Sequence, residues 1–153
     1  MSQWRPSRDG WPNGVFASLA NRFWMALTFA GAFSRDDLTV YAIHRGEQLL
    51  HRVLVTPRSY RFPFMARDDL QLGDLWTAPD HRGRGLARLA ARAIHADFAQ
   101  TSDNFWYLVP VDNVRSIGFI ESMGYDFVGL GVRTRPLGMH ILGQYKMDRK
   151  ISV

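Results

Sequence analysis

No cysteine occurs among the 153 residues of this chain, and that absence removes several functions at once. Disulfide-stapled folds, thiolate nucleophiles and cysteine-rich metal centres all need a residue that is missing here. Long apolar runs are missing too, since the longest uncharged one, Phe23 to Phe33, has 11 residues against the ~20 that cross a bilayer. The N-terminal residues MSQWRP lack the charged-then-apolar order of a signal peptide. We therefore expect a cytoplasmic protein with no membrane insertion.

The composition itself is that of a folded protein. Apolar residues make up 46% and aromatic residues 13%, which argues against disorder and suits one domain over residues 1–153. The formal net charge is +5, which fits nucleic acid, an anionic membrane surface or a small ligand with several phosphates. Because the arginines are scattered and form no single tract, nucleic acid ranks low among these partners. No internal repeat or low-complexity segment occurs.

Two common phosphate-binding motifs are absent. No run fits Gly-x-x-x-x-Gly-Lys-Ser/Thr, and Gly83-Arg-Gly-Leu-Ala-Arg88 stops after two of the three glycines of a dinucleotide fingerprint. The chain nevertheless places a strand, a basic glycine loop and a helix in direct succession. Leu70 to Thr77 predicts a buried strand, Pro79 ends its pairing, and apolar residues at helical spacing begin at Leu86.

The loop in this succession, Arg82-Gly-Arg-Gly85, predicts an anion site. The first turn of a helix has unpaired N–H groups and partial positive charge from the helix dipole. Arg82 and Arg84 add full charges, and the two glycines let the backbone approach a ligand closely. The expected anion is a phosphate. The helix face expected to pack on the sheet consists of Leu86, Leu89, Ala90, Ala93 and Ile94.

The other segments alternate between strands and helices. Residues 1–14 are expected to be an irregular lead-in, and Asn13 the cap of a helix that starts near Val15 and ends near Gly31. Strands are expected at 38–44, 48–56, 105–109, 125–133 and 142–147, with turns at 45–47 and 135–138 and a long aromatic connection at 57–69. Asp112 and Asn113 cap a helix of about 114–123, which Gly124 closes. The predicted fold is α/β (α+β), with one mixed, mostly antiparallel sheet and helices on both faces.

Two motifs in this framework resemble those of one enzyme superfamily. Arg-x-x-Gly-x-Ala over Arg82 to Ala87 resembles the pyrophosphate loop of the GNAT superfamily of acyl-CoA-dependent N-acyltransferases. Asn113-x-x-Ser-x-x-Phe-x-x-x-x-Gly-Tyr125 is similar to a second GNAT signature and begins 31 residues after Arg82. One helix and one strand separate the two motifs, as the family requires. The clear match covers about residues 73–127, and the N-terminal third fits only by the order of its elements.

The resemblance implies acetyl-CoA (coenzyme A) as co-substrate, no metal, and direct transfer of the acyl group to a primary amine. In such enzymes the strand before the loop and the strand after its helix splay apart, and coenzyme A enters the gap. The residues that the resemblance assigns to the cofactor are Leu75, Trp76 and Thr77 through their backbones, Arg82, Gly83, Arg84, Gly85, Leu86 and Ala87 in the loop, and Asn113 and Ser116. Asn113 is also explained as a plain helix cap, and Arg88 and Arg92 as a solvated helix face.

The catalytic groups are less clearly marked. The family's usual tyrosine, an acid for the departing thiolate, falls on Ile120, so either the thiol leaves without help or Tyr107 or Tyr145 donates. Asp74 is the expected base, because some GNAT enzymes such as polyamine acetyltransferases carry an acidic residue at this place, three residues before Thr77. The alternative is that Asp74 pairs with an arginine for structural reasons. The weaker candidates for the base are His44, His51 and His140.

The acceptor is only loosely indicated. Phe62-Pro-Phe-Met65, the strand at 73–77 and the arginine loop together resemble a GNAT branch linked to surface-glycan biosynthesis, which implies an amino sugar, free or nucleotide-linked. Residues 28–37 are expected either to form one wall of its pocket or to belong to a helix that packs on the sheet. The aromatic residues at 60–65 are expected either to line the pocket or to cover a sheet edge. A protein N-terminus, a lysine or an antibiotic amine stays open as an alternative acceptor. A homodimer stays open as the oligomeric state. The alternative functions are a non-catalytic acyl-CoA-binding relative and a basic nucleic-acid-binding module.

Overall fold

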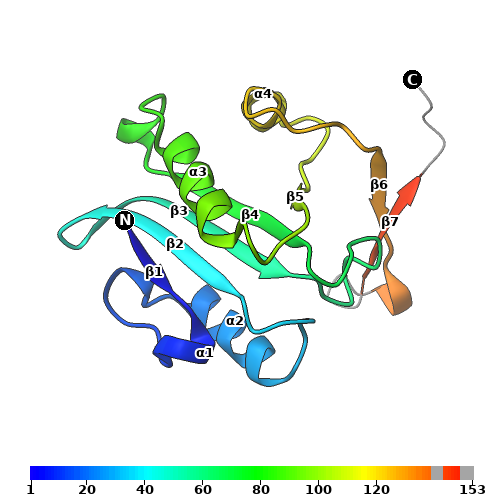
Figure 1. The fold of residues 1–153 in the computed structure, drawn as a ribbon, viewed down its shortest axis with the longest axis horizontal. Coiled ribbons are helices and arrows are strands. Elements are labelled where there is room, and N and C mark those ends of the chain that lie inside the picture. The colour runs from blue at the N-terminus through cyan, green and yellow to red at the C-terminus, as the bar shows by residue number, and fades with distance from the viewer. Residues whose placement is uncertain (139–142, 149–153) are drawn as a thin grey trace.

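The structure, a computed structural model, describes residues 1–138 and 143–148 (Figure 1). In chain order the elements are β1 (Ser2–Trp4), α1 (Pro6–Asp9), η1 (Gly14–Phe16), α2 (Leu19–Phe29), β2 (Thr39–Arg45), β3 (Gln48–Pro57), β4 (Leu70–Thr77), η2 (Pro79–His81), α3 (Leu86–Phe98), β5 (Phe105–Tyr107), α4 (Val114–Glu121), β6 (Leu130–Arg133), η3 (Pro136–Gly138) and β7 (Tyr145–Asp148), where η marks a 3₁₀ helix. Within these residues no helix has the length and apolarity that crossing a membrane requires.

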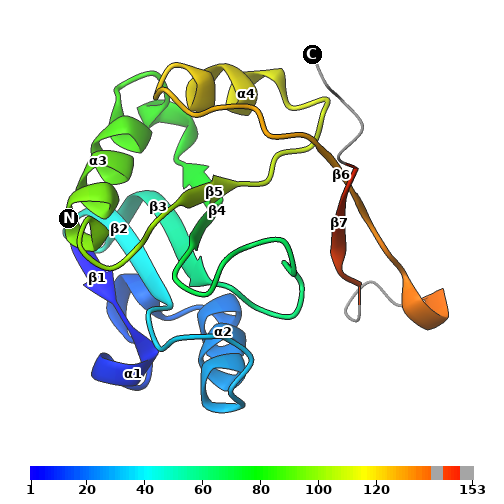
Figure 2. The same cartoon turned by 45° about the vertical axis from the view of Figure 1, so that its right-hand side comes forward.

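Five strands form the central sheet in the order β1-β2-β3-β4-β5. Neighbours are antiparallel except β4 and β5, which are parallel because the chain crosses through α3 between them. Helix α3 covers one face of the sheet, and α1 and α2 lie on the other (Figure 2). The predicted fold class, a mixed, mostly antiparallel sheet with helices on both faces, is confirmed.

Each face of the sheet has its own hydrophobic core. On the α3 side, Val53, Val55 and Leu72 meet Ile94 and Phe98. Burial of side chains of this size stabilises the fold by about 1.5–3 kcal/mol each. The core on the α2 side consists of Trp4, Phe16, Met25, Leu38, Val40, Ala42 and Leu54. Because β2 and β3 contribute side chains to both cores, these two strands are fixed in position between the two layers.

The N-terminal prediction was wrong in two respects. Residues 1–14 are not an irregular lead-in, because Ser2–Trp4 pairs with β2 and the indole of Trp4 is buried beside Phe16. Asn13 makes no side-chain capping bond, and the helix begins later, at Leu19. Ser18 caps it instead, since its hydroxyl accepts the N–H of Asn21 at 3.1 Å. A three-residue strand with a distant partner leaves almost no local signal.

The buried face of α3 also differs from the prediction. Leu89 is 57% exposed, whereas Ala90, Ala91, Ile94 and Phe98 face the sheet. Two adjacent alanines fit against the strands, and this turns the helix so that Leu89 points outward. Helical spacing alone does not decide between such neighbouring faces.

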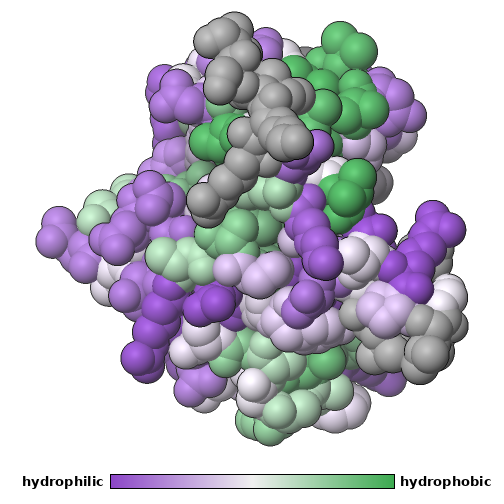
Figure 3. Space-filling model, turned by 90° about the vertical axis from the view of Figure 1, so that its right-hand side faces the viewer, coloured by the Kyte–Doolittle hydropathy of each residue, from purple (hydrophilic) through white to green (hydrophobic). Residues whose placement is uncertain are grey.

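The last two strands do not extend the central sheet. β6 and β7 pair only with each other, as a two-stranded sheet beside the aromatic connection at 57–69 (Figure 1). The strand predicted at 125–133 is shortened to β6, because the ring of Tyr125 packs on Tyr107 and its hydroxyl bonds His95. The strand predicted at 142–147 begins at Tyr145, and Leu142 lies outside the described residues. The face that carries this ribbon shows hydrophobic patches in Figure 3, and Val128, Leu130 and Val132 are exposed.

Candidate functional site

The middle of β4 contains a β-bulge. Leu54 of β3 lies opposite Gly73, whereas Arg52 lies opposite Trp76, so two residues of β4 face one residue of β3. One of those two is Asp74, whose φ of +46° lies in the left-handed region that side chains rarely adopt. The bulge aligns Asp74 with Gly73 on one wall of a pocket on the α2 side. A carboxylate is thereby presented at the centre of the sheet.

Immediately before the bulge, β4 and β5 separate. They pair only from Leu70–Phe105 to Leu72–Tyr107, and β4 then continues alone to Thr77. On that side β4 has no strand partner among residues 1–138 and 143–148 from Gly73 onward. Its side chains reflect this, since Leu75 and Trp76 are each 37% exposed. The backbone of Leu75, Trp76 and Thr77 therefore borders the kind of gap that the GNAT resemblance implies for coenzyme A.

The predicted anion loop lies at the far end of β4. Arg82 folds back, and its Nε donates to the carbonyl oxygen of Thr77 at 3.2 Å. Gly83 and Gly85 have φ values of +75° and +76°, which explains why the loop needs glycine at both places. Gly85 is the N-cap of α3, and no side chain caps the helix there. The residues that complete the loop are Arg84, which is exposed, and Leu86 and Ala87, which are half-buried in the first turn.

The start of α4 borders the same side of the molecule (Figure 2). Asn113 caps α4, because its Oδ1 accepts the N–H of Ser116 at 3.2 Å, and Ser116 is half-buried. Arg88 does not form a solvated face, which corrects the prediction. Its Nη2 donates to the hydroxyl of Ser122 at 2.8 Å and thereby ties the end of α4 to α3, while Arg92 is exposed as predicted.

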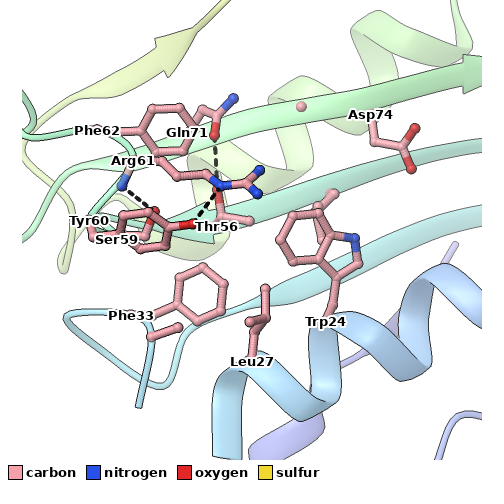
Figure 4. Close-up of a pocket in the computed structure, with 13 residues that line it drawn as sticks. Trp24, Leu27, Phe33, Thr56, Ser59, Tyr60, Arg61, Phe62, Gln71 and Asp74 are labelled. Atoms are coloured by element: carbon pink, nitrogen blue, oxygen red, sulfur yellow. Dashed lines mark hydrogen bonds between the residues drawn. The ribbon is translucent and has the colours of Figure 1, made fainter. Parts of the chain in front are cut away.

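On the opposite face of the sheet lies a pocket of about 140 Å³, shown in Figure 4. Its lining residues come from α2, from the segment after it, from the 57–69 connection and from β3 and β4: Trp24, Leu27, Ala32, Phe33, Leu54, Thr56, Ser59, Tyr60, Arg61, Phe62, Gln71, Gly73 and Asp74. Segments 28–37 and 60–65 thus both line a pocket, the sharper of the two interpretations that the sequence allowed. Thr56 and Gln71 hydrogen-bond each other at 3.1 Å.

Asp74 stands at one end of this pocket (Figure 4). Its carboxylate forms an ion pair with Arg52 at 3.1 Å, so the predicted structural partner exists. The side chain of Asp74 is still 47% exposed, so the ion pair with Arg52 does not bury the carboxylate. The two interpretations of Asp74 are therefore compatible.

None of the described histidines lines the pocket. His51 is buried, its Nδ1 lies 2.9 Å from the hydroxyl of Thr77, and burial lowers its pKa to about 4. His44 is held by the hydroxyl of Ser2 at 2.6 Å and the carbonyl oxygen of Gly46 at 2.8 Å. His140 lies outside the described residues. A group of three or more potential metal ligands does not occur in the described part of the chain.

A second cavity, of about 400 Å³, contains the residue that replaces the family's tyrosine. Ile120 lines it together with Tyr107 and Tyr125, whose rings meet edge to face at 4.9 Å. The hydroxyl of Tyr125 hydrogen-bonds His95 Nε2. Burial raises the pKa of Tyr107, so its hydroxyl stays protonated at neutral pH. Tyr145, the other suggested donor, stacks on Phe62 beside the first pocket instead.

Sequence reasoning missed several residues of these sites. Arg52, Thr56 and Gln71 are polar residues within otherwise apolar strands, and that interruption is a usable signal for a polar-lined pocket. Tyr125 was noted only as the last residue of the second motif, and nothing in the spacing of His95 connected it to Tyr125.

Comparisons with known proteins found a matching family model and solved structures with a similar fold. Residues 64–132 match the family described as FR47-like protein, a stretch that runs from the aromatic connection to β6. No curated protein matches the chain.

Three solved structures illustrate the shared fold. An aminoglycoside N-acetyltransferase, AAC(6')-Iy in complex with CoA, gives a TM-score of 0.65 at 12% identity over 88% of this chain and 97% of that one. A ribosomal-protein-alanine N-acetyltransferase from Brucella melitensis biovar Abortus 2308 gives a TM-score of 0.52 at 14% identity, over 77% of this chain and 83% of that one. An integron cassette protein from V. cholerae gives a TM-score of 0.53 at 17% identity, over 66% of this chain and 63% of that one. This chain therefore spans less than two thirds of that protein. The chain thus has the fold of GNAT acetyltransferases, and its FR47-like match spans both motifs that resemble that superfamily.

Proposed function

We propose that this protein transfers an acetyl group from acetyl-CoA to a primary amine of a small-molecule acceptor. The observation that carries the proposal is the position of the β4 bulge. On one side of it β4 separates from β5 and leads to the arginine loop, and on the other the aromatic pocket opens. Two ligands that enter from these opposite sides would meet at Asp74. Holding two reactants in line in this way is worth roughly 7–11 kcal/mol of the barrier.

The proposed roles follow from this arrangement. The loop from Arg82 to Ala87 would hold the pyrophosphate of acetyl-CoA, and Asn113 and Ser116 would lie beside its pantetheine arm. The open backbone edge at 75–77 would hydrogen-bond the pantetheine arm and the thioester carbonyl. An alkyl ammonium has a pKa near ~10, so Asp74 would take its proton, directly or through water. The amine nitrogen then forms a bond to the carbonyl carbon, the C–S bond breaks, and the thiolate takes up a proton.

For the acceptor we propose an amino sugar, free or nucleotide-linked. The rings of Tyr60 and Phe62 offer flat apolar surfaces that suit the C–H face of a sugar, and Arg61 offers a cation for a phosphate. A cytoplasmic location, a single domain and a homodimer also stay predictions.

Two measurements test the function together. Calorimetry should show acetyl-CoA binding, and a screen of sugar-nucleotide amines, polyamines and peptides should find an amine that releases free thiol. Binding without thiol release from any amine would favour the non-catalytic relative. Oligonucleotide binding that weakens steeply with salt, in the absence of acetyl-CoA binding, would favour the nucleic-acid module and overturn the proposal.

A further inference from the structure

We infer that the acceptor carries an anionic group, a carboxylate or a phosphate, close to its amine, and that Arg61 binds this group. The inference rests on the proposed function, because it concerns the acceptor of that reaction. Its basis is that the pocket places one carboxylate and one guanidinium, Asp74 and Arg61, on walls of the same cavity.

The other lining residues offer a ligand few polar contacts. Trp24, Phe33, Tyr60 and Phe62 supply aromatic rings from three separate segments of the chain. The hydroxyl of Thr56 donates to Oε1 of Gln71 at 3.1 Å, so these two oxygens are already engaged with each other. In a pocket of about 140 Å³ with such walls, the charged side chains dominate the selection of a polar ligand.

Arg61 is held in place by its own neighbours. Its Nε donates to the hydroxyl of Tyr60 at 3.3 Å, and its guanidinium carbon lies 5.9 Å from the centre of that ring. Its backbone is anchored as well, since its N–H donates to the hydroxyl of Ser59 and its carbonyl oxygen accepts the N–H of Tyr145 at 2.8 Å. In Figure 4 the side chain reaches across the pocket toward Trp24. A guanidinium positioned beforehand loses little entropy when it binds an anion.

The two charged side chains of the site favour the same class of ligand. Asp74 and Arg61 carry opposite charges on walls of one pocket, and Asp74 is paired with Arg52 at 3.1 Å. This arrangement suits a molecule whose ammonium faces Asp74 and whose anion faces Arg61. This separates the chain from its aminoglycoside-acetylating structural neighbour, with which it shares the fold at 12% identity.

Carboxylates and phosphates both bind a guanidinium through two parallel hydrogen bonds, so the chemistry of Arg61 alone does not distinguish them. An amino acid would supply the first and a phosphorylated or nucleotide-linked amino sugar the second. The cavity encloses only the part of the acceptor next to the amine.

The test compares amines that differ only in the anion. L-phenylalanine is paired with 2-phenylethylamine for the carboxylate, and glucosamine 6-phosphate with glucosamine for the phosphate. We expect the anionic member of at least one pair to be preferred about tenfold or more in kcat/KM, the worth of one charge-assisted contact. In R61Q this preference should vanish through a higher KM for the anionic amine, while the KM for acetyl-CoA stays the same.

The control is R67Q, which removes the same charge from the same connection outside the pocket and should keep the preference. Equal rates within both pairs, a better rate with a polyamine, or a preference that survives in R61Q would overturn the inference and leave the acetyltransferase intact. Acetyl-CoA binding with no thiol release from any amine would overturn the proposed function and the inference with it.

Discussion

Asp74 combines two properties that few surface carboxylates share. Its backbone adopts φ of +46°, and its side chain is paired with Arg52 yet 47% exposed to the pocket. A left-handed residue with a Cβ costs on the order of 1–3 kcal/mol, which the surrounding sheet must offset. The strain places the carboxylate where the pocket and the open edge of β4 come together.

Asp74→Asn tests the role of this charge, since asparagine tolerates the same backbone conformation and keeps a hydrogen-bonding side chain. We expect turnover to fall by ~10²–10⁴-fold with acetyl-CoA affinity nearly unchanged. The defect should shrink at high pH, where more of the amine is already neutral. Asp68→Asn is the control, because it replaces an exposed carboxylate on the 57–69 connection by a carboxamide. This variant should keep full turnover. If D74N turns over normally at pH 7, Asp74 is not the base, and catalysis relies on positioning and water.

We propose Tyr107, and not Tyr145, as the acid for the departing thiolate. It lines the cavity that also contains Ile120, whereas Tyr145 stacks on Phe62 near the acceptor pocket. Tyr107→Phe should lower kcat by about tenfold with acetyl-CoA affinity unchanged, and Ile120→Tyr should recover the loss in the Y107F background, because it restores a hydroxyl to that cavity. Tyr145→Phe is the comparison and should leave kcat unchanged. Equal kcat in Y107F and the native protein would mean that the thiol leaves without an acid.

At the scale of elements, β4 was predicted with its correct bounds and α3 with its correct start after the arginine loop. β-forming residues fill 70–77, Pro79 stops the ladder, and glycines at 83 and 85 adopt the positive φ that their type allows. These signals are local, so the sequence shows them directly. The bulge at Asp74 is not local, because it exists only in the register between β3 and β4. The pocket likewise needs five segments brought together by the fold, and the sequence indicated only two of them, 28–37 and 60–65, as candidates for its lining.

The arginine loop allows a matched pair of glycine variants. Gly85 and Gly46 have φ values of +76° and +56°, and a Cβ at either position would contact nothing within 4 Å. Valine at either place should cost a similar ~1–2 kcal/mol of stability. Only Gly85→Val, at the N-cap of α3, should also weaken acetyl-CoA binding, by about 10²-fold in a calorimetric titration, because it disturbs backbone N–H groups that would bind the phosphates. An equal loss of binding in G46V would show that the effect comes from stability alone.

At the scale of the molecule, the sheet is a partition with a separate hydrophobic core on each side. The net charge and the two motifs predicted a phosphate-binding acyltransferase fold, but neither indicated that the arginine loop and the aromatic pocket lie on opposite sides of β4. The same arrangement buries His51 at the middle of β3, beside Thr77. An ionisable group between two apolar layers makes the stability of the whole fold depend on pH.

The direction of that dependence follows from the pKa of His51. Burial lowers it to about 4 in the folded protein, against about 6.5 in an unfolded chain. Between these values the unfolded chain binds a proton that the folded protein does not, so stability falls as the pH drops from about 6.5 to about 4. Above pH 6.5 both states are neutral and this group has no effect. The loss amounts to at most about 3 kcal/mol. Urea unfolding at pH 7 and pH 4.5 should show a clearly smaller difference in His51→Gln than in the native protein, because glutamine does not titrate. If both proteins lose the same free energy of unfolding between pH 7 and pH 4.5, the acid sensitivity comes from the carboxylates and not from His51.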